Sequence, residues 1–179
     1  MSRRALLGAL LGLVPLGGCG FRPVHAPGRG EGRAAAPASA ALAAELAAVR
    51  VAPMYERYGQ LFRRSLQNQL EGRAPGTAAR YLLTVAVQNE AEPLGYRQDG
   101  TITRIRMVST ARWTLTTDAI PPVPIEQGSA RTLDSFNIPD LQFYAAEISR
   151  EAMDRRLIEE LSDRVVQGVA IALGRRLRA

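Results

Sequence analysis

Side chains able to do chemistry are few in this chain of 179 residues, and their spacing matches no familiar catalytic constellation. Cysteine and histidine occur once each, at Cys19 and His25, so a zinc site built from several such residues is excluded. The chain contains neither a Gly-x-Ser-x-Gly elbow nor a glycine-rich loop ending in Lys-Ser/Thr. His25 lies in a stretch of glycine, proline and alanine that offers it no catalytic partner. We therefore expect no metal and no cofactor.

Carboxylate pairs, which could act as general acid and base, occur near the C-terminus. Glu147 and Glu151 are one helical turn apart, and Glu159, Glu160 and Asp163 follow them. All five stand among arginines on the charged side of a predicted helix, a pattern typical of a solvated surface. The pattern therefore favours a binding or assembly protein over an enzyme.

The basic residues are all arginines: the chain has 23 of them, no lysine, and a net charge of +6. A planar guanidinium binds phosphates and carboxylates in bidentate fashion, so a phosphate-rich partner is one interpretation. A GC-rich genome is the alternative, because it replaces lysine by arginine and enriches alanine, glycine and proline. Composition leaves both open, and the position of each arginine has to decide.

Cys19 ends a segment with the layout of a secretory signal. Arg3 and Arg4 form a positive start, residues 5–14 are uncharged and apolar, and small residues precede the cysteine. The apolar run is shorter than the ~20 residues of a membrane-spanning helix, which argues against a permanent membrane segment. We predict that residues 1–18 are a signal peptide.

The four residues Leu16-Gly17-Gly18-Cys19 resemble the lipobox of bacterial lipoproteins. The resemblance implies cleavage before Cys19 and attachment of lipid, including palmitate-type acyl chains, to its sulfur and its new amino group. More than one chain is needed for lasting attachment, since each buried CH2 contributes only ~0.8 kcal/mol. Gly20, where aspartate would signal retention, implies sorting to the outer membrane, with the protein facing the periplasm. A signal without lipidation and a coincidental cysteine is the alternative.

The rest of the chain divides into a tether and one domain. Residues 19–41 are rich in glycine, proline and alanine without an amphipathic period, which predicts a flexible tether. Residues 42–179 are predicted to form a single α+β domain, long enough for a hydrophobic core. Its expected elements are a short helical turn at 41–48, strands at 49–54, 80–88, 104–116 and 125–136, a turn-rich loop at 90–100, and helices at 55–71 and 141–177.

Hydrophobic periodicity carries these assignments. In 104–116 residues alternate with a period of two, which predicts a half-buried antiparallel strand. In 141–177 an apolar residue recurs every four positions, which predicts a long amphipathic helix. In 55–71 five apolar residues share one helical face: Tyr58, Leu61, Phe62, Leu66 and Leu70. We expect two helices packed on one face of a mainly antiparallel four-stranded sheet, in the order β-α-β-β-β-α.

Four motifs follow one another along the chain: the start Cys19-Gly20-Phe21, the helix GQLFRRSLQNQL at 59–70, the loop GYRQDG at 95–100 and the helical Ser162-Asp163-Arg164. Their order resembles the lipopolysaccharide (LPS) assembly lipoprotein family, LptE. The resemblance covers about residues 19–177, and the order and spacing of the motifs carry it.

The resemblance implies a non-enzymatic partner of the large LPS-transport β-barrel, LptD. Members of the family sit as a plug inside this barrel, help it to assemble, and contact LPS. Two helices on a four-stranded sheet are the fold that it implies. No nucleic-acid partner is expected. Another outer-membrane lipoprotein, auxiliary to an ABC-type lipid transporter or to the β-barrel assembly machinery, is the alternative.

The resemblance also implies site residues. Arg97, in the loop before the long strand, takes the place of a basic residue associated with LPS contact, and Tyr96 beside it could cover acyl or sugar surface. A solvent-exposed arginine in a turn is the alternative. A second basic site of the family does not align with one residue here, because this chain carries an insertion between Ile138 and Glu151 relative to the family pattern, and Arg150 is the candidate for it. Three arginines of one strand face form a possible anionic-ligand or barrel-contact stripe, or serve solubility: Arg104, Arg106 and Arg112.

Overall fold

The computed structural model describes residues 37–72, 74–140 and 142–178. Its elements are α1 (Pro37–Ala47), β1 (Val49–Val51), α2 (Glu56–Glu71), β2 (Tyr81–Tyr96), β3 (Ile102–Thr117), β4 (Pro124–Asn137) and α3 (Phe143–Arg176). The predicted α+β class is confirmed, with one helix more than expected because the helical turn at 41–48 is part of α1. The predicted signal peptide, the predicted lipid attachment at Cys19, His25 and the predicted tether up to residue 36 lie outside the described residues. The last residues of the predicted tether, 37–41, are helical and belong to α1.

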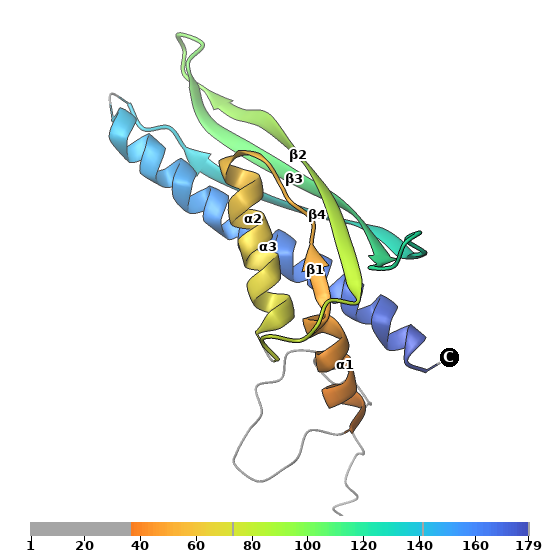
Figure 1. Cartoon of the computed structure of the whole chain (residues 1–179). Coiled ribbons are helices and arrows are strands. Elements are labelled where there is room, and N and C mark those ends of the chain that lie inside the picture. The colour runs from red at the N-terminus through yellow and green to blue at the C-terminus, as the bar shows by residue number, and fades with distance from the viewer. Residues whose placement is uncertain (1–36, 73, 141, 179) are drawn as a thin grey trace, which may run out of the picture. The chain divides into compact units, whose positions relative to one another are not determined.

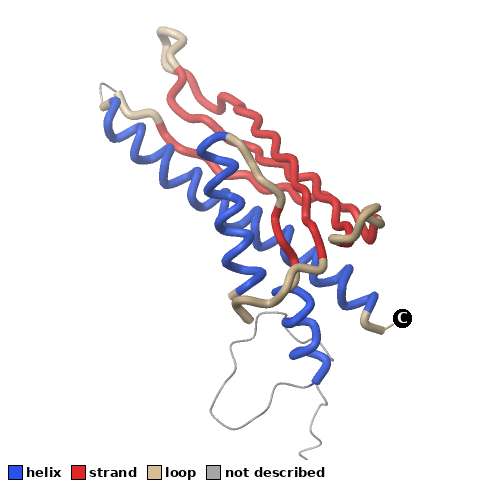
Figure 2. Tube along the Cα trace, in the orientation of Figure 1, coloured by secondary structure: helices blue, strands red, loops and turns tan. Residues whose placement is uncertain are grey.

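The four strands form one sheet in the order β1-β2-β3-β4, and the helices pack on one of its faces (Figures 1 and 2). Strands β2, β3 and β4 are antiparallel neighbours, as predicted, whereas β1 runs parallel to β2. The parallel pair arises because α2 connects its two strands, and a crossover helix returns the chain in the same direction. The predicted strand at 49–54 ends at Val51, just before Pro53, which has no N–H to donate to a sheet.

Strand β3 has the predicted alternation. Ala111, Trp113 and Leu115 are buried beneath the helices, whereas Arg104 and Arg112 are exposed. We call the sheet surface turned away from α2 and α3 the open face. Because side chains alternate along a strand, the even-numbered residues of the central part of β3 lie on this face.

Strand β2 continues through Tyr96, so the predicted loop at 90–100 is wrong for its first seven residues. Glutamate and proline in this stretch have low strand propensity, but pairing with β3 overrides it. Glu90 lies opposite Val108 and Glu92 opposite Arg106, and Pro93 stands beside a register shift. Proline is tolerated there because β2 is an edge strand beyond the short β1.

Helix α2 buries Phe62, Leu66 and Leu70 as predicted, while Tyr58 is partly buried. Leu61 is 40% exposed, so its assignment to the buried face is wrong. The reason is geometric: 3.6 residues per turn place Leu61 at the border of the stripe centred on Phe62 and Leu66.

Helix α3 runs along β4 and also contacts α2 and α1. Six members of its four-residue apolar repeat are buried as expected: Met153, Leu157, Leu161, Val165, Val169 and Leu173. The seventh, Leu177, is the C-cap residue and is 46% exposed. Trp113 of β3 lies between two glycines, Gly128 of β4 and Gly168 of α3. A Cβ atom would stand 2.5 Å from the Trp113 Cζ2 at the first and 2.8 Å from it at the second. The indole thus fixes how closely α3 approaches the sheet.

Candidate functional site

The turn between β2 and β3 is tightly built around Arg97. The Arg97 amide donates to the Thr101 carbonyl at 2.9 Å, and the Gly100 amide donates to the Arg97 carbonyl at 3.0 Å. Gly100 has φ +85, a conformation that favours glycine. The Thr101 amide donates to Asp99 at 2.9 Å and holds the pKa of that carboxyl below its ordinary value. The turn therefore presents the Arg97 side chain from a defined backbone.

Among the described residues Arg97 forms one ion pair, and it also interacts with the charge of Asp99 in its own turn. Its guanidinium lies 3.7 Å from the carboxylate of Asp140, in the segment that leads from β4 into α3. The Arg97 side chain is 28% exposed and that of Asp140 is 72% exposed. The contact is a long surface ion pair, which contributes ~0–1 kcal/mol and leaves the guanidinium able to take another anion.

Tyr96, the other residue predicted for this site, is 62% exposed, and Leu94 beside it is 41% exposed. Beyond Asp140, the start of α3 shows two further exposed aromatic rings, Phe143 and Tyr144. Sequence reasoning did not single out these two rings. The exposed ring of Tyr96 beside a weakly paired arginine suits an amphiphile that carries an anionic group.

Arg150 lies in the third turn of α3 and is engaged locally. Its guanidinium contacts Glu147 at 2.5 Å and Asp154 at 3.0 Å, pairs spaced three and four residues along the helix. The Glu147 hydrogen bond raises the pKa of Arg150. Such pairs are typical of a helix surface, and the structure does not bring Arg150 into contact with Arg97.

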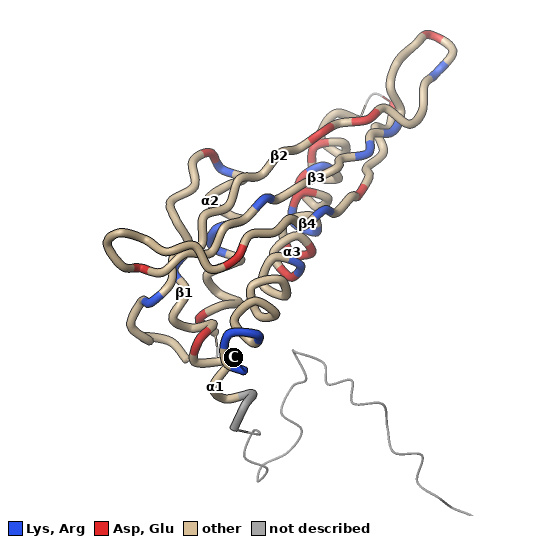
Figure 3. The backbone as a smooth tube through the Cα atoms, turned by 90° about the vertical axis from the view of Figure 1, so that its right-hand side faces the viewer, with Lys and Arg blue, Asp and Glu red and all other residues tan. Residues whose placement is uncertain are grey.

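The three arginines of the predicted stripe differ in their partners: Arg104 and Arg106 contact neighbouring side chains, whereas Arg112 forms no ion pair among the described residues. Arg104 donates to the Ser135 hydroxyl at 2.8 Å, and Arg106 forms an ion pair with Glu92 at 3.3 Å. Arg112 is exposed and has no ion-pair partner among the residues that the structure describes. Figure 3 shows basic positions recurring along β3, whereas the acidic positions of β2 lie toward its end. Strand β4 has one basic residue, Arg131, and two acidic ones, Glu126 and Asp134. The free charge of the open face therefore lies near its centre.

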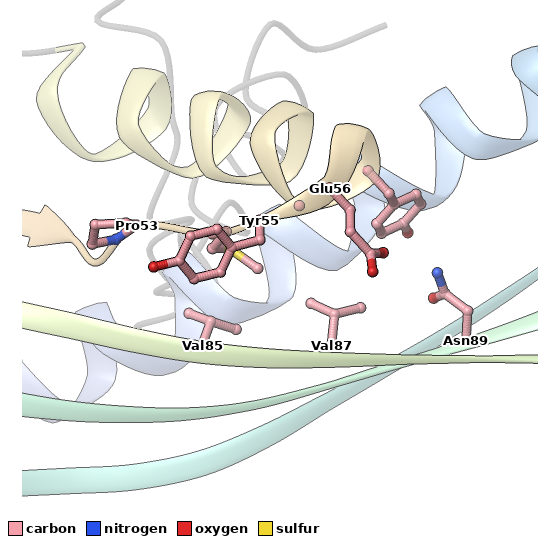
Figure 4. A pocket seen from close by; sticks show the side chains of 9 residues that line it. Pro53, Tyr55, Glu56, Val85, Val87 and Asn89 are labelled. Atoms are coloured by element: carbon pink, nitrogen blue, oxygen red, sulfur yellow. The ribbon is translucent and has the colours of Figure 1, made fainter.

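A groove of about 330 Å³ lies where β1 has ended, between the start of α2 and strand β2 (Figure 4). Its lining includes Tyr58 and Asn89, which are joined through a buried serine. Ser109 donates to Asn89 at 2.8 Å and lies 3.4 Å from the Tyr58 hydroxyl. Burial raises the pKa of Tyr58. This network satisfies the buried Ser109 hydroxyl and contains no nucleophile paired with a base.

Within the three described ranges, no cluster of three or more His, Cys, Asp or Glu residues could hold a metal ion. In the same ranges, no helix is both long and apolar enough to cross a membrane. What the described residues do present is a two-layer α+β domain with an uncovered sheet face and an exposed aromatic and basic end.

Such a domain is a member of a defined family. The family model described as LptE, lipopolysaccharide-assembly, matches residues 46–168, and the chain belongs to this family. The predicted family is thus confirmed. Comparison with curated proteins gives no match.

Solved structures of lipoproteins share the fold. A lipoprotein of Caulobacter crescentus is 21% identical, with a TM-score of 0.60 over 74% of this chain and 95% of that one. Rare lipoprotein B of Shewanella oneidensis is 14% identical, with a TM-score of 0.53 over 74% and 98% of the two chains. A minor lipoprotein of Acinetobacter baumannii is 15% identical, with a TM-score of 0.51 over 69% and 88%. At these identities the likeness shows the fold alone.

Proposed function

We propose that this protein is a non-enzymatic, outer-membrane lipoprotein subunit of the LPS-transport machinery. In this role it binds an LptD-like β-barrel, helps it to assemble, and contacts LPS. The observation that carries the proposal is the family match over residues 46–168, which spans β1 to most of α3. The exposed arginines and aromatic rings support a role in binding.

The contact with LPS is proposed at the β2–β3 turn. The Arg97 guanidinium can exchange its long contact with Asp140 for a bidentate pair with a lipid phosphate, a stronger charge-assisted interaction. Tyr96, which is 62% exposed, is placed to cover apolar or sugar surface of the same molecule.

The membrane attachment is proposed at Cys19, on the lipobox pattern of residues 16–19. Its acyl chains would hold the domain at the periplasmic side of the outer membrane, where a barrel partner would be folded. A tether between Cys19 and α1 would let the domain reach that partner.

Depletion of the protein in its own cells tests the function. We expect both the correctly assembled LPS-transport barrel and the surface-exposed LPS to fall, while other outer-membrane barrels keep their levels. Re-expression of the full chain should restore both, and the Cys19→Ala variant should restore them poorly. Unchanged amounts of assembled barrel and surface LPS after depletion would contradict the proposal.

A further inference from the structure

We propose that the open face of the sheet, centred on Arg112 and Arg131, is the surface that docks onto an acidic protein wall. Naming the partner as the inner wall of the transport barrel rests on the proposed function. The location and chemistry of the surface rest on the sheet itself.

The register of the β3–β4 pairing places the two arginines diagonally next to each other on one face of the sheet. In the β3–β4 pairing, Arg112 lies opposite Ser129 and Arg131 lies opposite Thr110. Both arginines therefore belong to the alternating set that points away from the helices, on neighbouring strands and one diagonal step apart. Diagonal neighbours in an antiparallel sheet are about 7–8 Å apart between Cα atoms. Both side chains are exposed.

The charge of this pair is not balanced by the sheet. In the described part of the chain, neither arginine forms an ion pair, whereas α3 pairs Arg156, Arg164 and Arg175 with acidic neighbours at 2.6 to 2.7 Å. The sheet residues around the two arginines on the open face carry no charge: the hydroxyl or amide residues Thr84, Gln88, Thr110, Thr114, Gln127 and Ser129, and the apolar Ala86 and Leu133. At the edge of the sheet Arg131 also lines a surface pocket with Glu160 and Arg164 of α3, which are paired with each other. Two adjacent positive charges repel each other, and an anionic partner removes that cost.

The polarity of the open face favours a protein partner over a lipid. Exposed apolar side chains on this part of the sheet are limited to Ala86 and Leu133, the latter 56% exposed. An acyl chain would find little apolar surface there, whereas carboxylates, hydroxyls and bridging waters of a protein wall would find partners. The interior wall of a membrane β-barrel is polar in this way.

The size of the face also suits a protein interface. Three long strands at about 4.8 Å spacing and about 3.3 Å per residue give a surface of roughly 45 Å by about 15 Å, or roughly 700 Å². A stable protein interface buries about 800 Å² on each partner. The open face alone thus supplies most of one standard interface.

Photo-crosslinking in the full-length protein, expressed in its own outer membrane, tests the docking face. A photoreactive amino acid replaces Ser129 on the open face or, as a matched control, the exposed Glu159 on α3. We expect the Ser129 position to crosslink to the barrel and the Glu159 position not to do so. Crosslinks to the barrel from Glu159 only, or from Ser129 to LPS only, would overturn the inference.

Charge reversal gives a second measurement. The double variant Arg112→Glu/Arg131→Glu should lower the amount of co-purified barrel about tenfold or more, because like charges across an interface cost several kcal/mol. The control Arg64→Glu/Arg155→Glu reverses two exposed arginines on the helices and should stay near the wild-type level. Both should keep the wild-type melting temperature.

The two possible failures are distinguishable. If the wild-type protein co-purifies the barrel but the open-face variant does so equally well, the docking face is wrong and the proposed function stands. If the wild-type protein co-purifies no transport barrel at all, the proposed function fails as well.

Discussion

The guanidinium of Arg97 lies 3.7 Å from the carboxylate of Asp140, which links the β2–β3 turn to the segment that enters α3. Two residues far apart in the sequence thus share one surface site. The carboxylate is the more exposed partner, and the pair is long, so a phosphate can compete for the arginine. This relationship makes the proposed LPS contact testable from both of its ends.

Arg97→Glu should weaken LPS binding about tenfold or more, since a hydrogen bond to a charged group contributes about 1.5–3 kcal/mol. Arg155→Glu, on the exposed surface of α3, is the control and should leave binding unchanged. Binding of purified protein to LPS, measured by fluorescence or calorimetry, checks both. Equal binding by the two variants would remove Arg97 from the site.

Asp140→Asn should act in the opposite direction. It removes the carboxylate that competes for Arg97 while keeping the side-chain shape, so LPS binding should strengthen by up to about fivefold, the value of a ~1 kcal/mol ion pair. The same binding assay measures it. Weaker binding would mean that Asp140 positions Arg97 for the ligand, contrary to our interpretation.

The contact of Trp113 with Gly168 predicts a steric penalty. A Cβ at Gly168 would stand 2.8 Å from the indole, so Gly168→Ala should lower the free energy of unfolding by about 1–3 kcal/mol. Gly174, in the same helix, has nothing within 4 Å of such a Cβ. Gly174→Ala should therefore stabilise the protein by about 0.5–1 kcal/mol through helix propensity. Urea denaturation measures both, and the same sign for the two variants would contradict the packing.

Two buried serines should respond differently to alanine. Ser109 donates to the exposed Asn89 and lies near the partly buried Tyr58, so Ser109→Ala removes a hydrogen bond and should cost about 0.5–1.5 kcal/mol. The Ser162 hydroxyl is fully buried and finds no hydrogen-bond partner among the described residues. Ser162→Ala should thus be neutral or stabilising by about 1 kcal/mol. Thermal melting of both variants checks the contrast.

Alkaline pH should destabilise the fold through Tyr58. Burial is the main cause that raises its folded-state pKa above the ordinary value of 10.0. The resulting stabilisation is fully present below pH 10.0 and is lost as the pH rises through the folded-state pKa. Denaturation curves at about pH 9 and about pH 11 should show a smaller loss for Tyr58→Phe than for the wild type. An equal loss in both proteins would contradict the burial of the phenol.

The long elements could be predicted from the sequence because each repeats one pattern over many residues. The two-residue alternation that includes Trp113 predicted strand β3, and the four-residue apolar repeat that includes Leu161 predicted helix α3. The end of β2 could not be predicted, because Glu90, Glu92 and Pro93 are held in the strand by β3 across the hairpin. Parallel pairing of β1 was missed for a similar reason: three residues carry too little pattern to fix a direction.

The candidate sites depended even more on contacts between distant residues. Arg97 could be found from its loop, but its pairing with Asp140 depends on where β4 ends. Arg131 was missed because its position beside Arg112 follows from the β3–β4 register and not from either strand alone. Once that register was fixed by the alternation of both strands, the adjacent arginines could have been deduced.

Purification of the full-length protein from detergent-solubilised outer membranes tests the central claim most directly, through the identity of its largest stoichiometric partner. The account predicts that this partner is an LptD-like β-barrel. An ABC-type lipid transporter or the β-barrel assembly machinery in that position, with no transport barrel, would contradict it.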